Sequence, residues 1–99
     1  MAVTPRVRQV MQEVALRKVV LDVLNPLKGP SIVELAKTLS SVDGVSKVMV
    51  VVNEIDVETV TLTITVEGPD IDFEDLKSGI ERLGGVIHSV DQVVAESSG

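Results

Sequence analysis

The stretch TVTLTITVE at residues 59–67 alternates apolar and polar side chains without a break. Val60, Leu62, Ile64 and Val66 share one face of an extended chain, and the threonines share the other. A period of two residues is typical of a β-strand with one buried face. Valine is stiff at χ1 and suits a pleated surface, so the 21 valines among 99 residues indicate that a sheet carries much of the fold.

Three more strands are predicted around this one. A strand at about residues 45–54 leads into it through a tight acidic hairpin at residues 55–58. The first strand of the chain covers about residues 16–24 and ends at NPLKGP, residues 25–30, where one glycine and two prolines favour a turn. The last strand covers about residues 86–94.

Two helices are predicted between the strands. Ser31 and Glu34 have the spacing of a capping box, so the first helix begins at Ser31 and ends before residues 43–44, Asp-Gly. Asp72 is the expected N-cap of the second helix, which ends at the glycine pair of residues 84–85.

The resulting order is strand, helix, strand, strand, helix, strand. Each strand–helix–strand crossover is expected to be right-handed, and two interleaved units form one sheet. The sequence therefore predicts an α+β fold: a ferredoxin-like βαββαβ sandwich, with an antiparallel sheet in the order 4-1-3-2 and both helices on one face. The side chains expected to face the helices are Ile32, Leu35, Leu39, Leu62, Ile64, Leu76, Ile80 and Leu83.

The chain is expected to form one domain at residues 16–96, with a polar tail at residues 97–99. Residues 1–15 are interpreted as a partly helical or disordered extension, which is either a loosely held arm or an arm that clasps a neighbouring subunit. No apolar run approaches the ~20 residues of a membrane helix, and no signal peptide is recognised. The expected location is the cytoplasm.

Composition excludes several classes of function. The chain has no cysteine, which removes disulfides, thiol nucleophiles, zinc fingers and iron–sulfur clusters. The net charge is −6, and an acidic body repels phosphate backbones. Phe73 is the only aromatic residue, so no platform for stacking bases can be built. Nucleic acid is therefore not an expected partner.

His88 and Asp22 are the candidate catalytic residues. His88 is the only histidine, and Asp22 is a charged residue inside an apolar strand. Their strands are predicted neighbours, so Asp22 could orient His88 as a general base. The alternative for His88 is a structural or interface role. The alternatives for Asp22 are a solvated position opposite Thr61, Thr63 or Thr65, or an anchor for a ligand or subunit.

Two further groups are candidates for ligand binding. Asn25, Lys28, Gly29 and Ser31 lie where backbone N–H groups at a helix start could hold an anion or small metabolite. The carboxylates of the hairpin offer the oxygen ligands that calcium and magnesium take, although they match no calcium-loop motif. The candidate metal ligands are Glu54, Asp56 and Glu58.

Two stretches of this chain resemble a family of small archaeal proteins, domain-of-unknown-function family 211. They are LDVLNP at residues 21–26 and GGVIHSVD at residues 84–91, and the resemblance covers roughly residues 16–96. It implies a ferredoxin-like fold, an archaeal source and ring-like homo-oligomers, and it implies no established activity. A weaker likeness is to ACT-type regulatory domains, which bind small ligands at the turn between their first strand and first helix.

The sequence favours a homo-oligomeric binding module over an enzyme. The first and second strands put apolar groups on both faces, which predicts an apolar open face and an interface between copies. A divalent cation or small metabolite is the expected ligand at the subunit boundary. The alternatives are a small enzyme that uses His88 and Asp22, and a purely structural or interaction protein.

Overall fold

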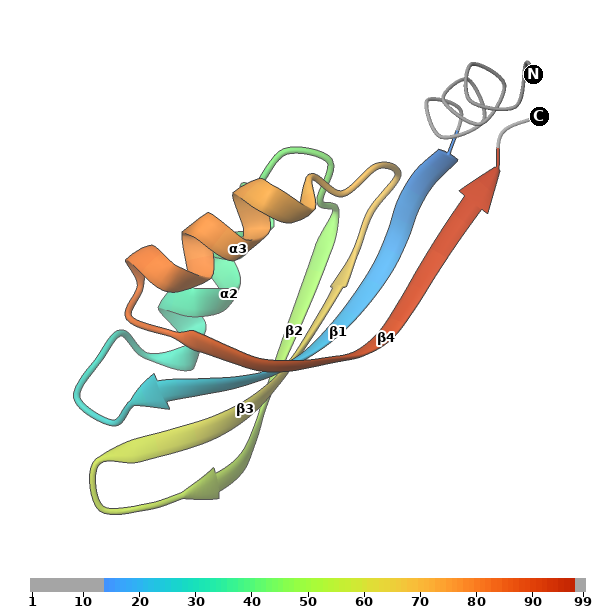
Figure 1. Ribbon diagram of the computed structural model, residues 1–99. Helices are drawn as coiled ribbons and strands as arrows, with labels where there is room; N and C mark the ends of the chain where they lie inside the picture. Colours follow the sequence, from blue (N-terminus) through green and yellow to red (C-terminus); the bar gives the residue numbers. More distant parts are fainter. Residues whose placement is uncertain (1–13, 98–99) are drawn as a thin grey trace, which may run out of the picture.

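The computed structural model describes residues 14–97, and the N-terminal extension expected at residues 1–15 lies outside this range except for its last two residues. The chain forms one four-stranded antiparallel sheet in the order β2-β3-β1-β4 with both helices on one face, which confirms the ferredoxin-like α+β fold (Figure 1). The elements in chain order are β1 (Val14–Pro26), α2 (Ile32–Ser40), β2 (Lys47–Ile55), β3 (Thr59–Glu67), α3 (Phe73–Arg82) and β4 (Val86–Ser97).

The pair of strands β1 and β4 is longer than predicted. β1 begins at Val14 and β4 continues to Ser97, and these two residues are paired. Figure 1 shows that this part of the pair extends as an arm past the helices. β-propensity alone does not predict these extra residues, because both end segments mix polar and apolar side chains. They form strands because the two segments, which are distant in the sequence, pair with each other.

Both helices begin at the predicted caps. The Ser31 hydroxyl accepts a hydrogen bond from the Glu34 backbone N–H at 3.2 Å, and the Glu34 carboxylate accepts one from the Ser31 N–H at 3.3 Å. The Asp72 carboxylate accepts from the Asp75 N–H at 3.1 Å. These bonds satisfy N–H groups that the first turn of a helix leaves unpaired.

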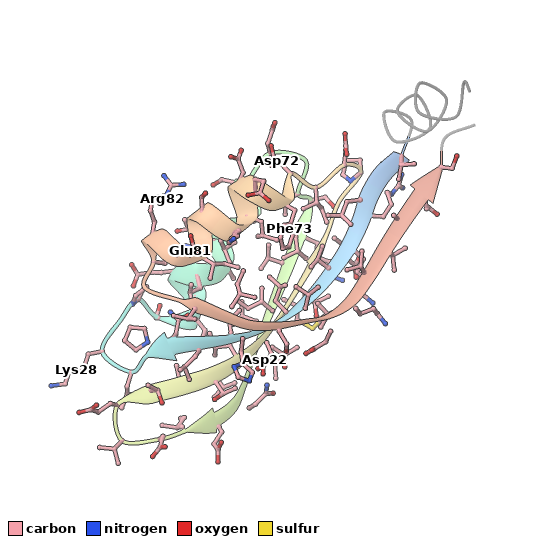
Figure 2. The ribbon with its side chains drawn as sticks, in the orientation of Figure 1. Asp22, Lys28, Asp72, Phe73, Glu81 and Arg82 are labelled. Atoms are coloured by element: carbon pink, nitrogen blue, oxygen red, sulfur yellow. The ribbon has the colours of Figure 1, made fainter. Side chains whose placement is uncertain are left out.

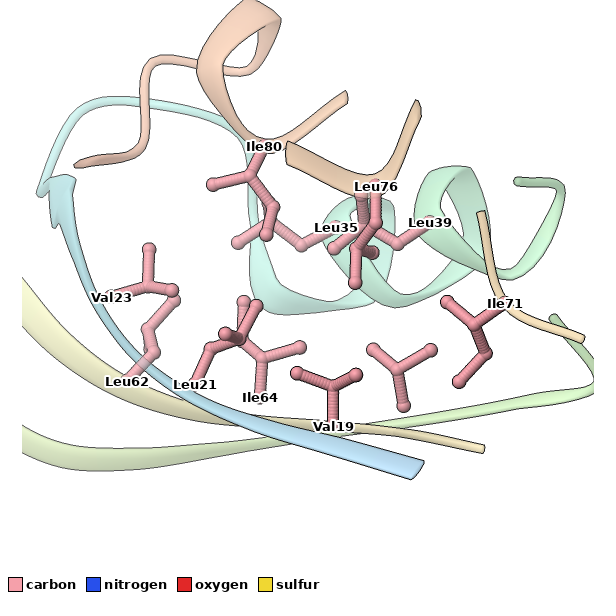
Figure 3. Close-up of a cluster of buried hydrophobic side chains, with 11 residues drawn as sticks. Val19, Leu21, Val23, Leu35, Leu39, Leu62, Ile64, Ile71, Leu76 and Ile80 are labelled. Atoms are coloured by element: carbon pink, nitrogen blue, oxygen red, sulfur yellow. The ribbon is translucent and has the colours of Figure 1, made fainter. Parts of the chain in front are cut away.

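The core lies between the sheet and the helices, and Figure 3 shows its side chains meeting there. Six of the eight predicted residues are fully buried: Leu35, Leu39, Leu62, Ile64, Leu76 and Ile80. The core also contains Val19, Leu21, Val23, Val66 and Ile71.

Two of the predicted core residues differ from the expectation. Ile32 is 38% exposed, because it is the first residue of α2, one turn before the first buried residue of that helix, Leu35. Leu83 is only partly buried, since it caps the C-terminal end of α3 and packs at the border of the core.

The face of the sheet opposite the helices carries no covering element within residues 14–97, and we call it the open face. Cross-strand partners lie on the same face, so the register defines it. Asp22 lies between Thr63 and Ser89, and Thr63 also pairs with Val51. The open face is therefore crossed by rows of mixed polar and apolar side chains.

The register shifts by one residue at several places in the sheet. Asp22 pairs with Ser89 and Val23 pairs with Ile87, so His88 is an extra residue on β4. Asp91 on β4 and Asn53 on β2 are extra residues in the same way. Such β-bulges redirect a side chain and strengthen local twist, and they are frequent at sheet edges and beside functional sites.

No helix among residues 14–97 combines the length and apolar character that crossing a membrane requires.

Candidate functional site

A small hollow in the open face brings together the two candidate catalytic residues. Its volume is about 230 Å³. It is lined by Asp22, Val23 and Leu24 from β1, Thr61 from β3 and His88 from β4. Figure 2 shows Asp22 on the side of the sheet away from α3. Three strands that are far apart in sequence therefore supply one carboxylate, one hydroxyl and one imidazole to the same place.

The β-bulge explains how His88 reaches this hollow. In a regular strand, residues alternate between the two faces, and both neighbours of Asp22's partner Ser89 would face the helices. The partner of Val23 is instead Ile87, which packs against the core, and the extra residue His88 turns onto the open face. The bulge thus turns His88 toward Asp22 on the open face, while the preceding residue of β4, Ile87, faces the core.

The polar groups of the hollow have no partners of their own within residues 14–97. The carboxylate of Asp22 is half-buried, and it accepts no hydrogen bond and meets no cation within the distance of an ion pair. The imidazole of His88 is exposed and likewise makes no side-chain hydrogen bond. Thr61 also leaves its hydroxyl free. All three side chains are available to a ligand.

The polar groups around the hollow are already paired with one another. The Asn53 Nδ2 donates a hydrogen bond to the Thr63 Oγ1 at 2.6 Å, and Thr63 is the cross-strand partner of Asp22. The Ser89 Oγ donates to the Asp91 Oδ1 at 2.8 Å. These two bonds fix the side chains on either side of Asp22 and leave its own carboxylate unpaired.

The open face also carries exposed apolar side chains. Leu24, Met49, Val51 and Val86 lie on the open face with exposed fractions of 40%, 46%, 45% and 62%. Leu24 pairs with Val86, while Met49 and Val51 lie on β2, beyond the threonines of β3. Exposed apolar side chains that gather on one face of a protein often mark an interaction site. The sequence prediction that the second strand is an edge strand with apolar groups on both faces agrees with the position of β2 at one edge of the sheet.

The open face has opposite charges at its two ends. Lys18 and Lys47 flank Glu67 in one row of cross-strand partners. At the other end, Glu54 pairs with Thr61, and the acidic hairpin follows. One end is therefore basic and the other acidic.

The four ligand candidates of the turn before α2 do not meet in one site. Ser31 and its N–H group are used by the capping box, which also brings the Glu34 carboxylate to the position where an anion would bind. Lys28 lines a hollow of about 450 Å³ with the hairpin residue Glu58. Gly29 donates its N–H to the Pro26 carbonyl at 3.0 Å, which closes the turn.

Asn25 is the one buried polar side chain among the described residues. It is 1% exposed, and neither its Oδ1 nor its Nδ2 has a hydrogen-bond partner in the part of the chain that the structure describes. Its Oδ1 lies against Gly85, where an added Cβ would be 2.6 Å away. The carboxamide therefore lies beneath the turn between α3 and β4, and a buried amide without a partner is destabilising.

Replacing Asn25 with leucine, which has nearly the same shape, is expected to raise the free energy of unfolding by about 1–3 kcal/mol, because it removes an unpaired buried amide. Urea denaturation of both proteins measures the difference. A matched control is Asn53→Leu, which breaks the bond to Thr63 on the open face and is not expected to stabilise the chain. A loss of stability in Asn25→Leu would mean that the amide is paired in the native protein.

The three candidate metal ligands of the hairpin are also separated. Glu54 lies in β2 opposite Thr61, the Asp56 carboxylate accepts a hydrogen bond from the Val57 N–H at 2.8 Å, and Glu58 lines the hollow with Lys28. Within residues 14–97 no three histidine or acidic side chains gather closely enough to hold a metal ion. A cation site at the hairpin thus stays a prediction that needs donors from more than one copy.

The sequence predicted both the carboxylate and the imidazole of the hollow, Asp22 and His88, but not how the strands bring them together. Thr61 was one of three threonines proposed opposite Asp22, and the register assigns Thr63 to that position and Thr61 to the hollow. The bulge at His88 has no marker in the sequence, since β4 contains no glycine or proline there. Only the break in the alternation of Val86, Ile87, His88, Ser89 and Val90 could have suggested it.

Comparison with known proteins gives a family without an assigned activity. The model of the family DUF211, described as "Uncharacterized ArCR, COG1888", matches residues 17–98. A curated relative, "Uncharacterized protein MJ0319" of Methanocaldococcus jannaschii, is 44% identical over 80 residues, which is 81% of each chain. The match covers nearly the whole sheet and both helices, together with Asp22 and His88, and this chain belongs to the DUF211 family.

Proposed function

We propose that this protein is a homo-oligomeric binding module, whose copies meet through the open face and bind a divalent cation or small metabolite at the subunit boundary. The observation that carries the proposal is the uncovered apolar surface of Leu24, Met49, Val51 and Val86. Removing apolar surface from water stabilises an assembly by about 25 cal/mol per Å² before the costs of association are subtracted. A ring-like arrangement, which needs contacts through the sheet edges in addition to the open face, and a cytoplasmic location are part of this proposal.

A second copy is the occupant that the charges favour. The open face is basic at the row of Lys18 and Lys47 and acidic at Glu54 and the hairpin. Two such faces related by a two-fold axis perpendicular to the strands place the basic end of one copy against the acidic end of the other. An isologous contact requires this self-complementarity, and opposite charges also select the correct orientation.

The open edges of the sheet support the same proposal. β2 and β4 are the edge strands, and both expose apolar side chains: Val51 and Val52 on β2, and Val93 and Val94 on β4. Native proteins usually protect an edge with charge, proline or a covering element, and the centre of β2 has none of these. An edge without protection is suited to pairing with another chain.

The variant Val51→Asp tests the proposal. Val51 is 45% exposed in the middle of the open face, so a carboxylate at this position is buried without a partner in the assembly but meets water in the monomer. Light scattering at micromolar protein is expected to show a shift toward the mass of one chain. Circular dichroism is expected to show unchanged helix, because Val51 does not face the helices.

The control is Val57→Asp, which makes the same chemical change in the turn of the hairpin. Val57 is 85% exposed and belongs to no strand, so the mass is expected to stay that of the wild-type protein. If Val51→Asp keeps the wild-type mass, the open face is not the contact between copies. If it unfolds the chain, the assignment of faces to β2 is wrong.

A small enzyme is the second candidate, and one observation favours it. His88 and Asp22 line the same hollow, so a carboxylate is near the imidazole that would act as a general base. Catalysis of this kind also needs the carboxylate to orient the imidazole, and no hydrogen bond joins the two side chains in the described part of the chain. We therefore rank this activity below the binding module.

A further inference from the structure

We propose that the hollow of Asp22 and His88 is half of a binding site for a divalent transition-metal ion such as zinc, completed when a second copy covers the open face. This inference rests on the proposed function, because one copy supplies too few ligands. Each copy contributes one imidazole nitrogen and one carboxylate oxygen, and two copies contribute four donors.

The chemistry of the donors selects the class of metal. Zinc is held by four ligands in a tetrahedral arrangement, and imidazole nitrogen and carboxylate oxygen are both among its usual donors. Calcium and magnesium prefer oxygen ligands alone, so His88 is a poor ligand for them. The pair of Asp22 and His88 therefore fits a transition metal better than the hard cations expected from the acidic hairpin.

The second observation that supports a metal site is that the polar side chains of the hollow are unpaired within residues 14–97. In this described part of the chain, Asp22, Thr61 and His88 line the hollow without a side-chain hydrogen bond or ion pair, whereas the neighbouring Thr63 and Ser89 are both bonded. The β-bulge turns His88 out of the regular alternation toward Asp22. Bulges often redirect a side chain toward a functional site.

The balance of charge is the third observation that supports a metal site. When a second copy covers the open face, two Asp22 carboxylates lose contact with water, and their nearest neighbours on the sheet are the uncharged residues Thr63, Ser89 and Leu24. Buried charges persist only when they are paired or coordinate a metal. A divalent ion neutralises two carboxylates completely, while the two imidazoles bind it in their neutral form.

The position of the hollow suits a shared site. Asp22 is on β1, one of the two central strands of the sheet, and its partner on the other central strand is Thr63, the middle residue of β3. A two-fold axis through the middle of the open face thus passes near Asp22 and brings the two hollows to face each other. A contact centred on either edge strand would not do so.

Calorimetric titration of the metal-stripped, full-length protein with zinc chloride tests this site. The expected result is a stoichiometry of one ion per two chains, with magnesium giving no comparable heat. His88→Gln and Asp22→Asn are each expected to weaken zinc binding by at least about tenfold, because each removes two of the four ligands. Cobalt substitution is expected to show the visible absorption of a tetrahedral site, which His88→Gln abolishes.

Glu81→Gln is the matched control, since it removes an exposed carboxylate from α3 on the other side of the sheet (Figure 2). It is expected to leave zinc binding unchanged. Absence of zinc binding to an oligomer that forms without metal overturns this site and leaves the proposed function standing. A mass of one chain both with and without zinc overturns the proposed function itself, and with it the shared site.

Discussion

Replacing Ile80 with alanine is expected to lower the free energy of unfolding by about 2–5 kcal/mol. Ile80 is fully buried in α3 and lies against the glycine turn that follows the helix, where an added Cβ on Gly85 would be 2.8 Å from its Cγ2. Surroundings that tight cannot collapse into the space left by three lost carbon atoms, so the cost includes a cavity as well as lost burial. Chemical denaturation monitored by circular dichroism measures it.

The control for this prediction is Val33→Ala in α2. Val33 is 60% exposed, so alanine removes little buried surface and improves helix propensity. Its stability is expected to change by less than about 0.5 kcal/mol, as for most surface substitutions. A similarly small effect at Ile80 would show that α3 does not pack on the sheet as described.

Replacing Gly44 with alanine is expected to cost more than about 2 kcal/mol, through two separate effects. Gly44 has φ of +78°, a conformation that residues with a Cβ rarely adopt. An added Cβ would also lie 1.6 Å from the backbone carbonyl oxygen of Asp70. The loop before β2 and the loop before α3 cross at this point, so the two backbones must separate to admit a methyl group.

Gly79→Ala provides the comparison for Gly44, because the same atom is added to a buried glycine. At Gly79 the nearest atom to the new Cβ is the flexible tip of Leu39 at 3.2 Å, and the residue lies inside α3, where alanine is favoured by about 1 kcal/mol. Its stability is expected to stay close to that of the wild type. Thermal melting of both variants checks the difference, and equal melting temperatures would contradict the crossing of the two loops.

Most of the fold could be predicted from local patterns. The threonine alternation of β3 gave a half-buried strand, and the capping residues Ser31 and Asp72 gave both helix starts. Such signals are contained within a few residues, so the sequence alone displays them. The strand order followed from the right-handed crossover rule.

The parts that escaped prediction depend on contacts between distant segments. The extension of β1 to Val14 exists because β4 pairs with it as far as Ser97. The bulge at His88 depends on how β4 adjusts its register to β1. Burial of the Asn25 carboxamide likewise depends on the turn after α3 closing over it. No local pattern records any of these.

The candidate site was predicted in part. Asp22 and His88 were singled out because a charge and an imidazole are unusual in apolar strands, and the structure brings both into one hollow. The candidates of the turn before α2 and of the hairpin were chosen by proximity in sequence. The structure distributes them among different environments, because a capping box, a closed turn and hairpin bonds already use several of these groups.

The central claim is that copies of this chain associate through the open face, and the mass of the wild-type protein tests it most directly. Size-exclusion chromatography with light scattering at micromolar protein is predicted to give a single mass that is a multiple of the 10.6 kDa of one chain. A single species with the mass of one chain under the same conditions would contradict the claim.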